Sequence, residues 1–169
     1  MSNEGMRLLQ QLEGCSLVAY PDSGGIFTIG FGNIKYLDGS PVKEGDKIDM
    51  VLAIRLFEET VKDFEKQVRL LLDGLVLPEI CIDSLVIFAY NVGCSAFCKS
   101  TLLKKIKSDK NNLEAIETEF LKWNKVNGKV VKGLTNRRKK EFDLYKKGIL
   151  NQYSKSEIYD KYVHKCDLK

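Results

Sequence analysis

The chain has 169 residues, of which 44% are hydrophobic and 30% are charged. This composition is typical of one ordinary globular domain and excludes disordered, collagen-like and coiled-coil rod proteins. No apolar run approaches the roughly 18 residues of a membrane span, and residues 1–11 show no basic region followed by an apolar one, so no secretory signal is visible.

The net charge of +4 is unevenly distributed along the chain. Residues 1–98 contain 8 Lys/Arg against 14 Asp/Glu, whereas residues 99–169 contain 19 Lys/Arg against 9 Asp/Glu. Such an asymmetry favours an anionic partner for the second half, such as nucleic acid, an anionic membrane or a cell-wall polymer. An ordinary solvated charged surface explains it equally well.

The cysteines predict neither a disulfide framework nor a metal site. Their number is odd, and only one pair is closely spaced: they are Cys15, Cys81, Cys94, Cys98 and Cys166. The single histidine, His164, lies in the tail, so no set of ligands has zinc-site spacing. We therefore expect free thiols made in a reducing compartment, and no metal or organic cofactor.

The first part of the chain combines a short helix with a small sheet. Met6, Leu9 and Leu12 lie on one side of a predicted helix over 3–13, which Gly14 ends. Residues 17–42 are rich in glycine, with short alternating stretches and an Asp-Gly turn, which predicts a small antiparallel sheet.

The rest of the chain has helical periodicity. Asp49 is a plausible N-cap for a long amphipathic helix that runs to about residue 72. Further helices are expected over 79–92, 100–108, 112–124 and 136–147, the last capped by Thr135 and ended by Gly148. A capping box at 154–157 predicts one more helix in the tail. Strands and helices are segregated, so the fold class is α+β.

The stretch from Glu13 to Asn33 contains the residues best suited to catalysis. Glu13 lies at the C-terminal end of a predicted helix, where the helix dipole favours a protonated carboxyl group that can act as a general acid. Asp22, on a polar loop, would stay ionised and orient a water molecule that the Thr28 hydroxyl also holds. Two carboxyl groups in such different environments suit glycoside hydrolysis.

The spacing of these residues resembles the active-site signature of the phage-type lysozymes, the endolysin family. The pattern is E-G-x-x-x-x-A-Y-x-D-x-x-G-x-x-T-I-G-x-G, with eight residues between Glu13 and Asp22 and five between Asp22 and Thr28. Two further blocks, 88–93 (F-A-Y-N-V-G) and 128–138 (G-x-x-x-x-G-L-x-x-R-R), are similar to later segments of the same family and occur in the same order.

The resemblance implies a lysozyme-like fold with a small sheet lobe and a larger helical lobe joined by a long helix. It also implies hydrolysis of the β-1,4 bond between N-acetylmuramic acid and N-acetylglucosamine in peptidoglycan, with Glu13 as general acid, Asp22 and Thr28 acting on water, and inversion at the anomeric carbon. We expect one domain over 1–169, divided into an N-terminal helix (1–13), a small β lobe with the catalytic cleft (14–48), a connecting helix (49–72), a helical lobe (73–148) and an additional tail helix (149–169).

Several other residues have both a functional and a structural interpretation. Arg137 and Arg138 both fit a cationic surface, and the family pattern implies a position over the catalytic glutamate for Arg137 alone. Asn91 would hydrogen-bond substrate or Glu13, or merely cap a helix. Gly30 would let a sugar approach the backbone, or serve a turn, and Phe31 would stack on a sugar or pack in the core.

Asn33 stands where many family members carry a histidine, which we interpret as structural. The absence of this histidine therefore affects local packing rather than catalysis.

Two other classes of protein remain as alternatives. One is an inactive lysozyme-like module that binds the wall or serves a structural role, although such a module needs none of Glu13, Asp22 and Thr28. The other is a nucleic-acid-binding protein, but the basic half has no recognised binding motif. We expect a monomer that acts on peptidoglycan glycan strands, without a nucleic-acid partner or stable membrane insertion. It would be made in the host bacterial cytoplasm and act on the periplasmic cell wall after release.

Overall fold

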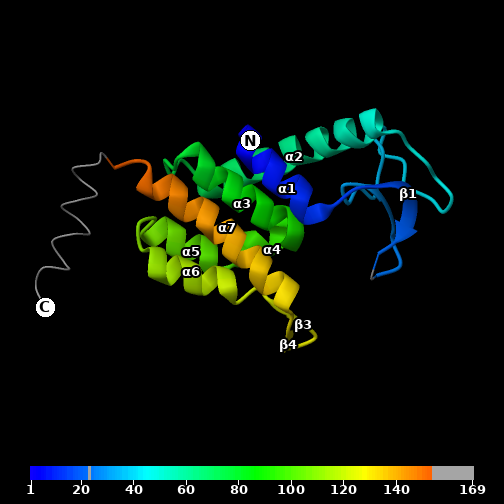
Figure 1. Cartoon of the computed structure of the whole chain (residues 1–169). Coiled ribbons are helices and arrows are strands. Elements are labelled where there is room, and N and C mark those ends of the chain that lie inside the picture. Colours follow the sequence, from blue (N-terminus) through cyan, green and yellow to red (C-terminus); the bar gives the residue numbers. More distant parts are fainter. Residues whose placement is uncertain (23, 154–169) are drawn as a thin grey trace, which may run out of the picture. The chain divides into compact units, whose positions relative to one another are not determined.

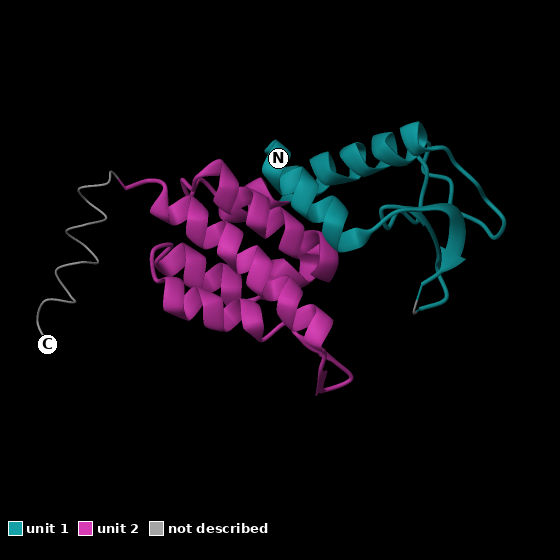
Figure 2. Cartoon of the chain, viewed as in Figure 1, with its two compact units in different colours: residues 1–67 teal, residues 68–169 magenta. Residues whose placement is uncertain are grey.

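The computed structural model describes residues 1–22 and 24–153, and the chain divides into two compact units, 1–67 and 68–169 (Figure 2). The described residues form seven helices and two two-stranded antiparallel sheets, which confirms the α+β class. None of these helices is both long enough and apolar enough to cross a membrane. From residue 154 onward, the predicted tail helix lies outside the described residues.

Unit 1 contains helix α1, a β-hairpin and most of helix α2 (Figure 1). The Ser2 hydroxyl accepts a hydrogen bond from the Gly5 N–H and caps α1 (Asn3–Glu13). The Asp49 carboxylate accepts one from the Leu52 N–H, at 2.7 Å, and so caps α2 (Met50–Leu72). Both helices have the predicted bounds because capping residues and hydrophobic periodicity agree on where each one begins.

The hairpin joins β1 (Ser16–Pro21) to β2 (Phe27–Gly30). Ser16 pairs with Gly30 and Tyr20 with Thr28, so the register shifts between these two pairs. Between these two pairs, β1 forms hydrogen bonds with residues 46–48 instead of with β2. The Ala19 N–H donates to the Asp46 carbonyl, and the Ile48 N–H donates to the Leu17 carbonyl. The hairpin is thereby fixed to the chain segment that leads into α2.

Apolar residues of the hairpin, the following loop and α2 form the core of unit 1. Ile29, Val42 and Leu56 are buried together, and partly buried neighbours such as Phe27 and Leu52 pack around them. Burial of these side chains is the main term that holds so small a sheet, because an isolated two-stranded hairpin is at best marginally stable in water.

The described part of unit 2, residues 68–153, is helical apart from one short hairpin. Its elements are α3 (Glu79–Val92), α4 (Cys94–Lys99), α5 (Thr101–Ser108), α6 (Leu113–Leu121), β3 (Lys125–Val126), β4 (Lys129–Val130) and α7 (Lys132–Leu150). As the apolar sequence predicts, α3 is buried over most of its length, and α7 packs along it (Figure 1). The Phe88 ring lies 5.4–5.8 Å from the ring centres of Phe97, Phe120 and Trp123.

Three expectations for α7 are wrong in detail, and one hairpin was not expected. Helix α7 is longer than predicted at both ends, so Thr135 lies inside it and Val131 takes the N-cap position. Gly148 is also inside α7, where it serves close packing against α3 rather than the end of the helix. The β3–β4 hairpin was not predicted, although the Asn127-Gly128 pair, with φ of 49° and 78°, is a typical signal for such a turn.

Candidate catalytic hairpin and supporting cluster

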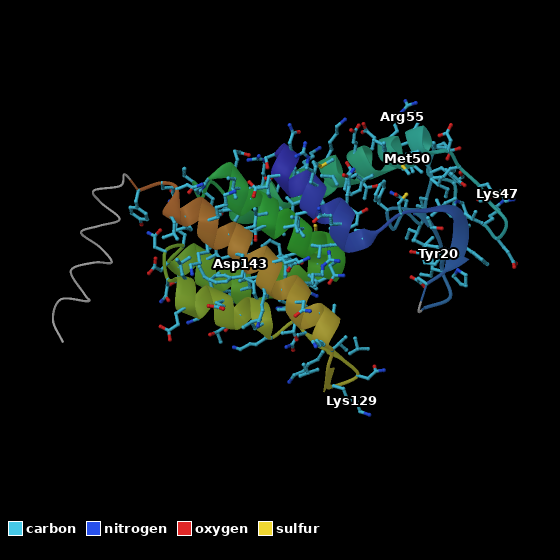
Figure 3. All side chains as sticks on the ribbon, in the orientation of Figure 1. Tyr20, Lys47, Met50, Arg55, Lys129 and Asp143 are labelled. Carbon is cyan, nitrogen blue, oxygen red and sulfur yellow. The ribbon has the colours of Figure 1, made fainter. Side chains whose placement is uncertain are left out.

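The hairpin of unit 1 places Asp22 and Thr28 on one face. Tyr20 pairs directly with Thr28, and the pairing continues with the Asp22 N–H donating to the Ile26 carbonyl at 2.9 Å. Asp22 lies one residue past the end of β1 and continues its pairing, so it is a diagonal neighbour of Thr28. The exposed Tyr20, the partner of Thr28, is labelled on this hairpin in Figure 3. Diagonal neighbours lie roughly 7–8 Å apart.

The carboxylate of Asp22 is held by its own loop. Its Oδ1 accepts hydrogen bonds from the Gly24 N–H at 2.8 Å and the Ile26 N–H at 2.9 Å, while Oδ2 accepts none from a described residue. A short aspartate side chain often orders a turn in this way. The result is an exposed carboxylate with a fixed direction and one oxygen that is not used by the loop.

The hydroxyl of Thr28 is buried, with the residue only 4% exposed. Its Oγ1 donates to the Ile26 carbonyl at 3.1 Å. Since the single hydroxyl hydrogen is used there, the lone pairs of Oγ1 remain as acceptors. Any water molecule bound at this hydroxyl must therefore donate a hydrogen to it.

Glu13 is the last residue of α1, immediately before the hairpin. The Gly14 N–H closes the helix on the Gln10 carbonyl at 3.0 Å, and Gly14 has a φ of 68° that suits glycine. Glu13 is half-buried, and the last turn of α1 carries no basic residue that would neutralise the negative end of the helix dipole. Only Gly14 and Cys15 separate Glu13 from the first residue of β1.

Gly30, Phe31 and Asn33 attach the hairpin to α2. Gly30 has a φ of 62°, and a Cβ there would lie 3.2 Å from the Asn33 Oδ1. The Phe31 ring is buried against Phe57, with 4.8 Å between ring centres, so Phe31 occupies the core position that the sequence left open. The buried Asn33 donates from Nδ2 to the Thr60 Oγ1 at 2.8 Å, which agrees with a structural role at this position.

Two other predicted residues, Asn91 and Arg137, belong to unit 2. Asn91 is exposed near the C-terminal end of α3, and its Oδ1 accepts a hydrogen bond of 2.6 Å from Nη2 of Arg138. Arg137 is 8% exposed and donates from Nε to the Glu141 Oε1 at 3.0 Å and from Nη2 to the Ile87 carbonyl at 3.4 Å.

Arg138 is not surface charge, and the expectation of a cationic surface position is wrong. Its side chain is fully buried, 3.2 Å from the Glu141 Oε1, with the guanidinium carbon 4.9 Å from the centre of the Phe88 ring. The signal in the sequence was Glu141 itself, three and four residues after the two arginines. Side chains at these spacings are neighbours on a helix.

A cavity of about 650 Å³ also lies within unit 1, and none of the predicted site residues lines it. Its walls come from the loop at 35–39 and from α2 between Arg55 and Asp63. Separately, no group of three or more histidine, cysteine or acidic side chains within the described ranges is placed to hold a metal ion.

Relatives of the chain are found among phage lysins. The family model described as phage lysozyme matches residues 10–141. The chain is 36% identical to an endolysin of Bacillus phage B103 over 88% of its own length and 54% of that protein, and 34% identical to the endolysin of Salmonella phage P22 over 86% of its own length and 97% of that protein. It thus spans about half of the first relative and nearly all of the second.

The fold is also similar to that of a solved relative. The endolysin of Escherichia coli O157:H7 phage FAHEc1 superposes with a TM-score of 0.76 at 35% identity, covering 85% of this chain and 91% of that one. The described residues therefore have the lysozyme-like fold that the sequence pattern predicted. The chain belongs to the phage lysozyme family.

Proposed function

We propose that this protein is a muramidase that hydrolyses the β-1,4 bond between N-acetylmuramic acid and N-acetylglucosamine in peptidoglycan. Membership of the phage lysozyme family supports this activity. The observation that carries the residue assignment is the hairpin register, which sets Asp22 and Thr28 on one face directly after the helix that ends at Glu13.

Glu13 is proposed as the general acid. A glycosidic bond breaks when the leaving oxygen receives a proton as the C–O bond opens, and a carboxyl group is the usual donor. The position of Glu13 at the end of α1, two residues before the hairpin that carries Asp22 and Thr28, supports this role.

Asp22 and Thr28 are proposed to hold the attacking water. The Thr28 hydrogen is used by the Ile26 carbonyl, and Asp22 Oδ1 is used by the loop. A water bound to the Asp22 Oδ2 and the Thr28 Oγ1 would donate one hydrogen to each and direct its lone pair toward the anomeric carbon. Asp22 would then accept the proton that the water loses on attack.

Attack by a separately held water inverts the anomeric centre. Inverting glycosidases keep their two carboxyl groups about 6.5–9.5 Å apart to make room for the water. The first product formed should therefore have the α configuration, which proton NMR of the anomeric signals can follow before mutarotation. Initial release of the β anomer would contradict the roles proposed for Asp22 and Thr28.

The remaining predicted residues are proposed to support the site. Arg137 would lie over the catalytic acid, as the family pattern implies, Asn91 would hydrogen-bond the glycan, and Gly30 and Phe31 would fix the position of the hairpin. We further propose that the protein is made in the cytoplasm of a bacterial host, acts as a monomer on the cell wall after release, and needs no cofactor.

A lysis assay with matched variants tests the function. The wild-type protein should clear a suspension of permeabilised Gram-negative cells, whereas Glu13→Gln should lose at least roughly a hundredfold in rate because it cannot donate the proton. Glu44→Gln, which neutralises an exposed carboxylate in a turn of the same unit, should behave like wild type. If the Glu13→Gln variant clears cells as fast as wild type, the catalytic assignment fails.

Binding to isolated murein separates an enzyme from an inactive wall-binding module. An enzyme releases soluble glycan fragments and loses this release in Glu13→Gln. If the protein is only a wall-binding module, the wild type and the Glu13→Gln variant will both sediment with the murein and neither will release fragments. That outcome would contradict the proposed function.

A further inference from the structure

The most unusual feature of unit 2 is a buried ionic cluster between α3 and α7. Arg138 and Glu141 are fully buried, and Arg137 is nearly so; Glu141 Oε1 accepts a hydrogen bond from Arg137 Nε and forms an ion pair with Arg138 Nη2 at 3.2 Å. Burying such charges costs several kcal/mol per ion, and apolar side chains of similar volume often stabilise a core equally well. The cluster therefore calls for an explanation beyond stability.

The Arg138 guanidinium lies between an aromatic ring and a carboxylate. One face of the group lies 4.9 Å from the centre of the Phe88 ring, a cation–π distance. Phe88 is itself enclosed by three other aromatic rings. Glu141 binds the guanidinium, and the backbone at Glu141 is fixed because the Ser84 hydroxyl donates to its carbonyl at 2.6 Å.

The buried guanidinium contacts one exposed residue, Asn91. Its Nη2 donates to the Asn91 Oδ1 at 2.6 Å, the short distance expected of a charge-assisted hydrogen bond. An amide whose oxygen is bound in this way can no longer exchange the positions of its oxygen and nitrogen. Its Nδ2 group makes no hydrogen bond to a described residue, and Asn91 is exposed, so the two N–H donors are directed away from the cluster.

We propose that Arg138, held by Glu141 and Phe88, is a positioning residue that presents the Asn91 amide as a pure hydrogen-bond donor to an oxygen of the glycan substrate. This inference rests on the proposed function. The fitting ligand group is an acceptor without a hydrogen of its own, and the carbonyl oxygen of an N-acetyl group on a sugar has this chemistry. The ionic cluster would thus contribute to substrate recognition rather than to the stability of the fold.

Asn91→Asp is the sharpest variant for this proposal. The aspartate keeps, and strengthens, the contact with Arg138, but it replaces the donor N–H group by an acceptor oxygen. Binding is measured in the Glu13→Gln background, with soluble murein glycan strands freed of peptide, so that the result does not depend on turnover. Asn91→Asp should weaken Kd about tenfold while the thermal unfolding midpoint stays the same or rises.

A matched control and a double-mutant cycle complete the test. Asn136→Asp, at an exposed asparagine of α7, should leave Kd unchanged. Arg138→Lys keeps the charge beside Glu141 but loses the planar guanidinium, so it should weaken Kd several-fold when Asn91 is present and have little further effect when Asn91 is alanine. A structural role for Arg138 predicts the same loss in both backgrounds.

The two outcomes that overturn the proposal are unambiguous. One is a wild-type Kd in Asn91→Asp, and the other is an equal effect of Arg138→Lys with and without Asn91. The proposed function fails separately, if the protein with Glu13 intact releases no fragments from murein. A protein that hydrolyses murein while Asn91→Asp binds normally would retain the function and reject only the positioning role.

Discussion

Asp22 uses one carboxylate oxygen for its loop and offers the other to solvent, and this division allows its two roles to be separated. Asn at position 22 retains an Oδ1 that can accept from the Gly24 and Ile26 N–H groups, but it has no charge and cannot take a proton. Ala at the same position loses both hydrogen bonds. The pair of variants thus distinguishes catalysis from loop structure.

We expect Asp22→Asn to lose roughly a hundredfold or more in rate with little change in thermal unfolding. Asp22→Ala should lose as much rate and also about 1 kcal/mol of stability, because two hydrogen bonds in an exposed loop disappear. Initial lysis rates and unfolding midpoints measure the two effects. Near-normal rates in Asp22→Asn would show that the side chain only orders the loop.

The sequence predicted the helix end at Glu13, the loop at Asp22 and the strand at Thr28, because these are local features of one short stretch; the catalytic roles of the three residues stay a prediction. Residue spacing failed at Arg138, since burial of an arginine depends on Phe88 and Asn91, about fifty residues earlier in the chain. The same is true of Phe31, whose partner Phe57 lies on another element.

At the scale of secondary structure, Gly148 shows why α7 continues beyond its predicted end. A Cβ at Gly148 would lie 2.5 Å from the Sγ of Cys81 and 3.0 Å from its backbone nitrogen. Cys81 is buried on α3, where its thiol donates to the Tyr145 carbonyl, and burial raises the pKa of the thiol to about 12. The glycine is therefore required by close helix packing, which local sequence patterns do not reveal.

Gly148→Ala should lower the free energy of unfolding by about 1–3 kcal/mol, since the added methyl group overpacks the contact between α3 and α7. Gly133→Ala is the matched control, because a Cβ at this position of the same helix meets nothing within 4 Å. It should be neutral or should stabilise by about 0.5–1 kcal/mol. Urea unfolding of both variants gives the comparison. Equal stability of the two alanine variants would contradict the packing explanation.

At the scale of the whole molecule, the charge asymmetry gives the proposed enzyme a cationic second half. Bacterial envelopes are anionic, so basic side chains raise the local concentration of protein at the wall, and salt screens this attraction. Lys139 and Lys140, exposed on α7, are suitable for testing the effect.

Raising the ionic strength from roughly 0.05 to 0.3 M should slow lysis several-fold. The double variant Lys139→Gln/Lys140→Gln should bind murein more weakly at low salt and lose less on addition of salt. Lys66→Gln, an exposed change in unit 1, should retain the wild-type salt dependence. Identical salt curves for all three proteins would assign the basic half to ordinary surface charge.

The most direct test of the central claim is mass spectrometry of murein digested by the full chain. The account predicts soluble fragments that end in a reducing N-acetylmuramic acid, because water supplies the new hydroxyl group, and no such fragments from Glu13→Gln. Fragments that end in an anhydro sugar, or equal yields from both proteins, would contradict hydrolysis by an acid at position 13.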